Sequence, residues 1–307
     1  MRAEKICVMM STFNGELFLE EQINSILNQN MVDVFLYIRD DGSNDGTIKL
    51  LKKYSSKSNV KVSLGHNIGV GYSFWELLKT APTGYEFYAW SDQDDIWDKD
   101  KLYIATKAIK KMGQDKPLLY YSESKCVDKN LNQIKQNYKR NPSVTLGSAL
   151  IRSNAQGATM LFNNTLRKLA ATYTPDFKNI KILHDAWIHK LCLAVDGRVI
   201  YDADSHMSYR IHGNNAVAIL PEKLTVVKQL RRKIKTKEAN YCSDIAKELL
   251  KEYKKYIPAS NMKLIYLLAN YKNDFPMYIK LLLSRKISTG DYKEDLKFKL
   301  KVLKRRA

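Results

Sequence analysis

The chain has 307 residues, of which 45% are hydrophobic, and its 51 Lys and Arg against 32 Asp and Glu give a formal net charge of +19 at pH 7. This length and apolar content are enough for one α/β domain with a sizeable core and an appended region. No segment approaches the roughly 18 apolar residues of a membrane span, and the charged start at 1–5 does not resemble a signal peptide. The four cysteines lack metal-binding or redox spacing, so we expect reduced thiols in a cytoplasmic protein.

The first third of the chain alternates predicted strands and helices. Short apolar runs predict strands at 5–10, 34–38, 60–64 and 86–90. Apolar residues at helical spacing follow the first three strands, and the first helix is predicted from Leu17, Phe18, Ile23, Ile26 and Leu27. This alternation is typical of a mostly parallel, Rossmann-like α/β sheet flanked by helices, in which ligands bind beyond the carboxyl ends of the strands.

Each of these four strands ends in a polar cluster. The clusters are Ser11-Thr12-Phe13-Asn14-Gly15, Arg39-Asp40-Asp41-Gly42-Ser43, His66-Asn67 and Asp92-Gln93-Asp94-Asp95. Because the carboxyl ends of parallel strands meet at one edge of the sheet, the clusters predict a single site. Asp40 or Asp41, with the loop at 11–14, can supply hydrogen bonds to the edge of a nucleotide base. The alternative for 41–43 is a capped turn, since Asp, Gly and Ser favour turns and N-caps, and both roles are compatible.

Three carboxylates within four residues, Asp92, Asp94 and Asp95, directly follow the predicted strand at 86–90. Carboxylates crowded at a buried strand end repel one another, and a cation removes that repulsion. Oxygen ligands from two Asp, with positions left for phosphate and water, are typical of Mg²⁺ or Mn²⁺ that serves a phosphorylated substrate. The alternative is a solvated acidic turn before a helix that Asp98 caps.

In this order and spacing the clusters resemble the nucleotide-sugar half of family 2 glycosyltransferases of the GT-A fold. The motifs are S-T-F-N-G, R-D-D-G-S-N-D-G-T, H-N-I-G-V-G and S-D-Q-D-D-I-W, and the resemblance continues at 156–163, 183–187 and 209–215. It implies a GT-A catalytic domain at 1–221, with a nucleotide-sugar half at about 1–115 and an acceptor half at about 116–221. A basic helical region at 222–307 follows.

The residues in these motifs are most similar to those of bacterial rhamnosyltransferases of surface polysaccharide synthesis. This resemblance implies an inverting, metal-dependent transfer of L-rhamnose from dTDP-rhamnose to a glycan or lipid-linked glycan acceptor. The alternative within the family is a hexosyltransferase that uses a UDP-sugar such as UDP-Gal or UDP-Glc.

The resemblance also implies roles for individual residues at matching positions. Donor-binding residues are expected at Ser11, Thr12, Asn14, Asp40, Asp41, Asn67, Asp92, Gln93 and Arg210. The planar fork of donors on Arg210 suits a diphosphate. Asp94 is the expected direct ligand of Mn²⁺ or Mg²⁺, with Asp92 and His212 as further candidates.

Inversion at the sugar carbon requires a base that takes the proton of the acceptor hydroxyl. The family uses a carboxylate of an E-D or H-D pair, which implies Asp185 of His184-Asp185 as the catalytic base. The alternative is an ordinary polar pair at the N-terminus of a helix. Contacts to sugar or acceptor are expected at Asp95, Gly157, His184 and Trp187, with core packing an equal alternative for Gly157 and Trp187.

The basic excess is concentrated at the C-terminal end, where residues 222–307 hold 23 Lys and Arg against 9 Asp and Glu. Helices are predicted at 224–256, 260–271, 276–283 and 292–305. Basic amphipathic helices are typical of proteins that bind anionic membranes, so we expect a peripheral protein at the inner face of the cell membrane. The alternatives are a helical subdomain packed on the catalytic domain and an oligomer interface.

Three other classes of protein are less compatible with the sequence. A nucleic-acid-binding protein would explain the net charge, but acidic clusters at the strand ends would repel phosphate backbones. A dinucleotide oxidoreductase would carry a G-x-G-x-x-G motif after the first strand, and this chain has none there. An inactive sugar-binding module would not need the carboxylates that are present, so the sequence favours a transferase.

Overall fold

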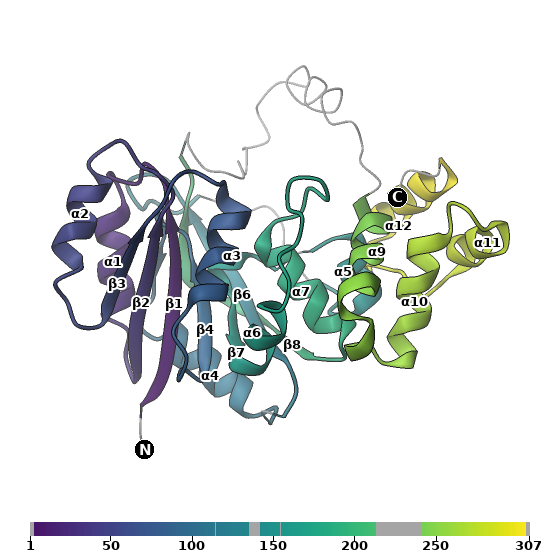
Figure 1. The fold of residues 1–307 in the computed structure, drawn as a ribbon, viewed down its shortest axis with the longest axis horizontal. Helices are drawn as coiled ribbons and strands as arrows, with labels where there is room; N and C mark the ends of the chain where they lie inside the picture. Colours follow the sequence, from purple (N-terminus) through teal and green to yellow (C-terminus); the bar gives the residue numbers. More distant parts are fainter. Residues whose placement is uncertain (1–2, 114, 135–141, 154, 213–240, 305–307) are drawn as a thin grey trace.

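A computed structural model of the chain describes residues 3–113, 115–134, 142–153, 155–212 and 241–304, and its centre is an eight-stranded sheet (Figure 1). The strands are β1 (Glu4–Thr12), β2 (Val32–Asp40), β3 (Val60–Leu64), β4 (Phe87–Ser91), β5 (Ile96–Trp97), β6 (Leu118–Val127), β7 (Leu161–Asn163) and β8 (Arg198–Arg210). They lie in the order β3-β2-β1-β4-β7-β6-β8-β5. The four strands β3, β2, β1 and β4 are parallel, and β7 and β5 run antiparallel to their neighbours.

Helices flank the sheet and continue beyond it. They are α1 (Leu19–Leu27), α2 (Thr47–Tyr54), α3 (Val70–Thr80), α4 (Lys101–Lys110), α5 (Leu146–Ile151), α6 (Asn164–Ala170), α7 (His184–Ala194), α9 (Tyr241–Tyr253), α10 (Ala259–Asn270), α11 (Phe275–Leu283) and α12 (Tyr292–Leu303). Within the described ranges no helix combines the length and the apolar character needed to cross a membrane.

Both faces of β1 are buried, because successive side chains of a strand point to opposite faces of the sheet. Ile6, Val8 and Met10 pack in one hydrophobic cluster with α1, α2 and α4. Cys7 and Met9 pack in the other cluster with α3, α6 and α7. The predicted α/β sheet with helices on both faces is therefore confirmed.

Two details of the predicted elements differ from the structure. The first helix begins at Leu19 rather than at Leu17, because the backbone N–H groups of Phe18 and Leu19 both donate to the carbonyl of Gly15 and form a turn there. Leu17 is consequently 80% exposed. The sequence also predicts a strand at 205–209, directly before Arg210, and in the structure this segment is the end of the much longer β8, which pairs with β6 along most of its length.

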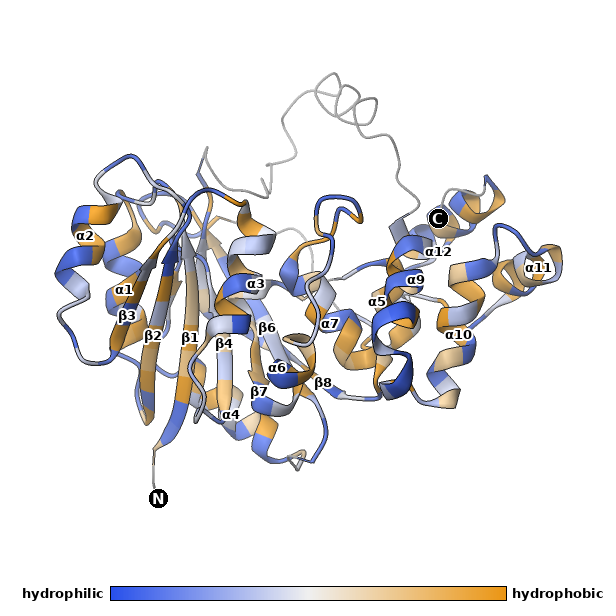
Figure 2. Cartoon of the chain, in the orientation of Figure 1, coloured by the Kyte–Doolittle hydropathy of each residue, from blue (hydrophilic) through white to orange (hydrophobic). Residues whose placement is uncertain are grey.

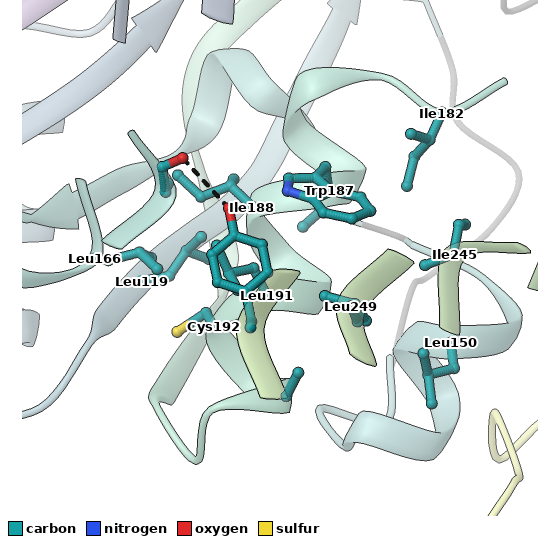
Figure 3. Packing of buried hydrophobic residues seen from close by; sticks show 14 of the residues in the cluster. Leu119, Leu150, Leu166, Ile182, Trp187, Ile188, Leu191, Cys192, Ile245 and Leu249 are labelled. Atoms are coloured by element: carbon teal, nitrogen blue, oxygen red, sulfur yellow. Dashed lines mark hydrogen bonds between the residues drawn. The ribbon is translucent and has the colours of Figure 1, made fainter. Parts of the chain in front are cut away.

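The C-terminal helices extend the hydrophobic core to which α7 belongs. Figure 3 shows Ile245 and Leu249 of α9 beside Trp187 and Leu191 of α7. The three helices predicted at 260–271, 276–283 and 292–305 are present as α10, α11 and α12. Of the helix predicted at 224–256, the structure describes only the part from residue 241 onward as α9, and 222–240 lie outside the described residues.

We expect Phe298→Ala in α12 to lower the free energy of unfolding by about 3 kcal/mol, since a buried Phe loses both its apolar contacts and the space it fills. Phe298 is 5% exposed and belongs to the core cluster. Leu300→Ala in the same helix is the matched control, because Leu300 is 47% exposed. Urea unfolding should separate the two variants clearly. Equal destabilisation by the two substitutions would contradict the packing of α12 against the core.

Candidate active site

The carboxyl ends of β1, β2, β3 and β4 bring the four polar clusters to one edge of the sheet. Thr12 pairs with Asp40 in the register of β1 and β2, and Met10 pairs with Ser91 in that of β1 and β4. The loop after β3 joins them, because the N–H of Gly65 donates to the carbonyl of Asp40 at 3.0 Å. In Figure 1 β1 runs upward from the N-terminus, so this edge lies at the top of the view.

Asp40 and Asp41 organise the loops that they are in. Asp40 accepts hydrogen bonds from the N–H groups of Gly42 at 3.0 Å and Ser43 at 2.9 Å. Asp41 accepts from the N–H groups of Ile68 and Gly69, at 2.9 and 3.0 Å, and so connects the loop after β2 to the loop after β3. Both carboxylates are buried. The capped turn is therefore present, and a contact with a nucleotide base remains a prediction.

Arg39 is a further organiser of this edge. Its buried guanidinium forms an ion pair with Asp41 at 2.5 Å and donates to Ser73 Oγ at 3.0 Å and to the carbonyl of His66 at 3.1 Å. Ser73 Oγ in turn lies 2.6 Å from Ser11 Oγ. Sequence analysis missed Arg39 and Ser73, although an Arg directly before Asp40-Asp41 at a strand end was a signal for an internal ion pair.

Gln93 connects the loop after β1, at 11–15, to the loop after β4, at 92–95, which we call the acidic loop. Its Oε1 accepts from Thr12 Oγ1 at 2.6 Å and from the N–H of Phe13 at 2.8 Å, and its Nε2 donates to the carbonyl of Phe13 at 3.1 Å. Asn14 makes a similar link, because its Oδ1 accepts from the N–H of Asn44 at 2.9 Å. Asn67 lies exposed at the rim of the site. These contacts hold the loops in place around the predicted donor site.

The acidic loop contains an excess of negative charge. Burial, together with the nearby negative charges of Asp94 and Asp185, raises the pKa of Asp92 to about 7. Burial also raises the pKa of Asp95 well above its usual range, with the charges of Asp92 and Asp94 contributing. Asp95 is fully buried, and its Oδ2 has no hydrogen-bond partner among the described residues. A bound cation would relieve this repulsion.

The residues of the predicted metal site are close together. Asp94 Oδ2 lies 2.8 Å from Nε2 of His212, which follows β8. No group of three or more His, Cys, Asp and Glu in the described part of the chain is arranged to hold a metal ion by itself. Mg²⁺ is commonly held by one or two carboxylates together with substrate phosphates, and Asp92 with Asp94 fits a site of that kind. Asp98 does not cap the following helix, which begins at Lys101.

Arg210 has contacts that differ from the expected one with a diphosphate. Its Nε donates to the carbonyl of Asp94 at 3.0 Å, NH1 donates to the carbonyl of Lys129 at 2.7 Å, and NH2 forms an ion pair with Glu21 at 2.5 Å. The guanidinium also lies 4.4 Å from the ring centroid of Phe18, and the residue is 2% exposed. This geometry favours a residue that positions the acidic loop.

We expect Arg210→Lys to weaken the apparent affinity for Mn²⁺ by about ten-fold, because a single ammonium cannot make three divergent contacts and residues that support metal ligands have effects of this size. Titration of Mn²⁺ at saturating donor measures it, with Arg198→Lys on the same strand as control. If Mn²⁺ affinity is unchanged and metal-free binding of the nucleoside diphosphate falls instead, Arg210 contacts the diphosphate as the sequence predicted.

Asp185 and His184 form the start of α7. Asp185 Oδ2 accepts from the N–H of Gly157 at 3.1 Å, and its Oδ1 accepts from the N–H of Ala186 at 2.6 Å. Asp185 is half-buried, and its negative charge contributes to raising the pKa of Asp92 on the acidic loop. A Cβ on Gly157 would lie 3.1 Å from His184 Nε2 and 3.2 Å from Asp185 Cβ, so a glycine there allows the close approach of the two segments.

His184 is buried in an aromatic environment. Its ring stacks on Phe74 with centroids 3.9 Å apart and meets the edge of Trp90 at 5.0 Å. Burial lowers the pKa of His184 to about 4, so the imidazole is neutral at pH 7. Neither ring nitrogen has a hydrogen-bond partner among the described residues. Trp187 is fully buried in the core beside α9, which supports the core-packing alternative for this residue (Figure 3).

Comparison with known families and sequences identifies relatives. The model described as "Glycosyl transferase family 2" matches residues 7–172. A dTDP-rhamnosyl transferase, RfbG, of Shigella flexneri is 28% identical over 221 residues, which cover 68% of this chain and 73% of the relative. A cholesterol galactosyltransferase of Borreliella burgdorferi is 31% identical over 107 residues, which cover 34% of this chain and 30% of the relative.

Solved structures share the fold. A fragment of Staphylococcus aureus TarS, residues 1–349, in complex with UDP-GlcNAc has a TM-score of 0.60 and 19% identity, covering 99% of this chain and 82% of that one. The mannosyltransferase PcManGT from Pyrobaculum calidifontis, in complex with GDP-Man and Mn²⁺, has a TM-score of 0.53 and 14% identity, covering 99% and 81%. The predicted GT-A fold is thereby confirmed.

Proposed function

Because this chain belongs to glycosyl transferase family 2, and is thus an enzyme that transfers a sugar from a nucleotide sugar, we propose that it transfers L-rhamnose from dTDP-rhamnose to a glycan or lipid-linked glycan. The similarity to the Shigella flexneri dTDP-rhamnosyl transferase over two thirds of the chain supports this donor. The alternative is a UDP-sugar such as UDP-Gal or UDP-Glc, which the similarity to a galactosyltransferase supports over a shorter stretch.

The observation that carries the proposal is the crowding of Asp92, Asp94 and Asp95 at the strand edge, opposite Asp185. Asp94, with Asp92 and His212, would hold Mn²⁺ or Mg²⁺. When bound, such an ion would neutralise the negative charge that develops on the departing diphosphate. Arg210 and Asp95 would hold the acidic loop so that the carboxylate of Asp94 faces the ion. The Arg210 side chain donates to the carbonyl of Asp94, and the backbone N–H of Arg210 donates to the carboxylate of Asp95 at 3.2 Å.

Asp185 is the proposed base. Its carboxylate would accept the proton of the acceptor hydroxyl as that oxygen bonds to the sugar carbon and the bond from the sugar to the phosphate breaks on the opposite side. The N–H groups of Gly157 and Ala186 fix the carboxylate in one orientation. Neutral His184 adds no positive charge beside Asp185, and its buried ring supports the first turn of α7 against Phe74.

The proposed setting is the cytoplasmic face of the cell membrane. A lipid-linked acceptor would be presented there, and the exposed apolar residues of α11 and α12 support an association with the membrane surface. Nucleic acid is not a proposed partner, because the site edge is acidic. A contact between two copies through the C-terminal helices is the competing use of those surfaces.

A panel of donors tests the proposed function. Thermal unfolding is followed with Mn²⁺ and, in turn, dTDP-rhamnose, UDP-Gal, UDP-Glc and GDP-Man. A donor at 100 times its Kd stabilises the folded state by about 2.7 kcal/mol, which raises Tm by several degrees. We expect dTDP-rhamnose to give the largest rise and to be consumed when a glycan acceptor is added. Stabilisation by UDP-sugars alone would replace the proposed donor with the alternative.

A further inference from the structure

Helix α12 has two separate apolar faces, and the molecule covers only one of them. Phe298 and Val302 are 5% and 0% exposed and pack in the core. A second apolar group is 43–78% exposed and consists of Tyr292, Leu296, Leu300 and Leu303. With about 100° between successive residues of a helix, these four side chains lie within an arc of roughly 80°, on a different side from Phe298 and Val302. They form a continuous stripe along the helix.

Helix α11 repeats this arrangement. Leu281 is 2% exposed and faces the core, whereas Phe275, Ile279 and Leu283 are 66%, 39% and 76% exposed. These three residues follow one another at four-residue steps, so they too form a stripe along one side of their helix. Figure 1 shows that α11 and α12 are at the end of the molecule farthest from β3, and Figure 2 shows hydrophobic residues on both helices. We refer to the two stripes together as the α11–α12 surface.

The charges around the stripe on α12 are basic. By the same helical geometry, Lys293 and Lys304 border one side of it and Lys299 borders the other, and all three are exposed. The acidic residues of α12 lie on other sides and have partners within the protein. Asp295 accepts from Ser288 Oγ and Thr289 Oγ1, at 2.5 and 2.7 Å, and Glu294 pairs with Lys297 at 2.7 Å.

We propose that the α11–α12 surface docks on a bilayer that contains anionic phospholipids. Amphipathic helices of this kind lie in the plane of the interface, with the apolar side among the acyl chains and the lysines near the headgroups. The proposal extends the proposed function and rests on it for the purpose of docking, which is to bring the active site to a lipid-linked acceptor. Its evidence is separate from the donor site, since every residue involved lies within 275–304.

The arrangement of charge favours a membrane over a second copy of this chain. In a two-fold symmetric dimer the same patch would face itself, so the lysines beside one stripe would lie against those beside the other. Like charges facing each other across an interface oppose association. An anionic bilayer instead supplies the opposite charge over the whole surface.

Sedimentation of the full chain with vesicles tests the proposal. We expect binding to vesicles of phosphatidylcholine with about 30% phosphatidylglycerol at low salt. The protein should be released as salt rises, because salt screens the attraction between lysines and anionic headgroups over roughly a nanometre. Leu296→Gln/Leu300→Gln removes two apolar contacts, and Lys293→Glu/Lys299→Glu reverses two charges. Each double variant should reduce the bound fraction about five-fold or more. Tm and donor-induced stabilisation should not change, because all four side chains are exposed.

Lys52→Glu/Lys57→Glu near α2 is the matched control for net charge, since both residues are exposed and α2 is at the other end of the molecule. Equal losses in the control and in Lys293→Glu/Lys299→Glu would mean attraction through total charge and would overturn the docking surface. Wild-type protein that stays in the supernatant at low salt would also overturn it. So would sedimentation velocity that shows a dimer which Leu296→Gln/Leu300→Gln dissociates while lipid binding persists. A failure of the donor panel would leave each of these results unaffected.

Discussion

Replacing Asp94 with alanine will lower turnover by about three decades, because the variant loses the expected metal ligand and a bound cation contributes several kcal/mol to stabilising the leaving diphosphate. The variant should also lose the additional thermal stabilisation that Mn²⁺ gives in the presence of the donor. Initial rates and thermal unfolding, each measured across a Mn²⁺ titration, check the two effects.

Asp98→Asn is the matched control for Asp94→Ala. Asp98 lies four residues away, and among the residues that the structure describes its side chain makes only an exposed pairing with Lys125 at 3.5 Å. Its activity and metal response should stay close to those of the wild type. Full activity of the wild-type enzyme in excess EDTA would remove the metal from the proposed function, whatever the effect of the substitution.

Replacing Asp185 with asparagine will lower the rate of transfer by about two to four decades while the donor still binds. Asparagine has nearly the same size, and its carbonyl oxygen can keep one of the two backbone hydrogen bonds, from Gly157 or Ala186. It cannot accept the hydroxyl proton. Single-turnover kinetics with saturating donor and acceptor measure the step directly, and donor affinity is measured separately.

Asp196→Asn, just after the other end of α7, is the control for Asp185→Asn, because Asp196 is exposed and pairs with Lys116. We expect it to transfer sugar at the wild-type rate. Should Asp185→Asn instead lose donor binding, or transfer at a rate near that of the wild type, the base is a different residue and Asp185 serves only as an N-terminal residue of α7.

The periodic parts of the fold were predictable from the sequence because their side chains follow local rules. The strand at 60–64 was predicted at its observed bounds, and the helices predicted at 276–283 and 292–305 begin within one residue of α11 and α12. Turn residues were less predictable. Leu17 fits the helical spacing, yet the carbonyl of Gly15 closes a turn there and leaves the side chain in solvent.

The partners of the site residues were not predictable, because they are far apart in the chain. Arg39 donates to Ser73 and to the carbonyl of His66. The guanidinium of Arg210 pairs with Glu21 and donates to the carbonyl of Lys129. A motif indicates which residue types gather at an edge. It does not indicate which of them bind each other and which face a ligand. The same limit applies to Trp187, whose burial depends on α9.

The contact between Asp94 and His212 has a consequence for the synthesis of the protein. These residues are 118 positions apart, and Arg210 reaches the same acidic loop from a similar distance. Domains begin to fold from their N-terminal end as the chain is made. The parallel strands β1 to β4 can therefore pair on the ribosome before His212 has been added, but the acidic loop then lacks its partners. The proposed cation site would therefore form only after β8 and His212 have been translated, and a nascent or truncated chain that ends before β8 would lack part of it.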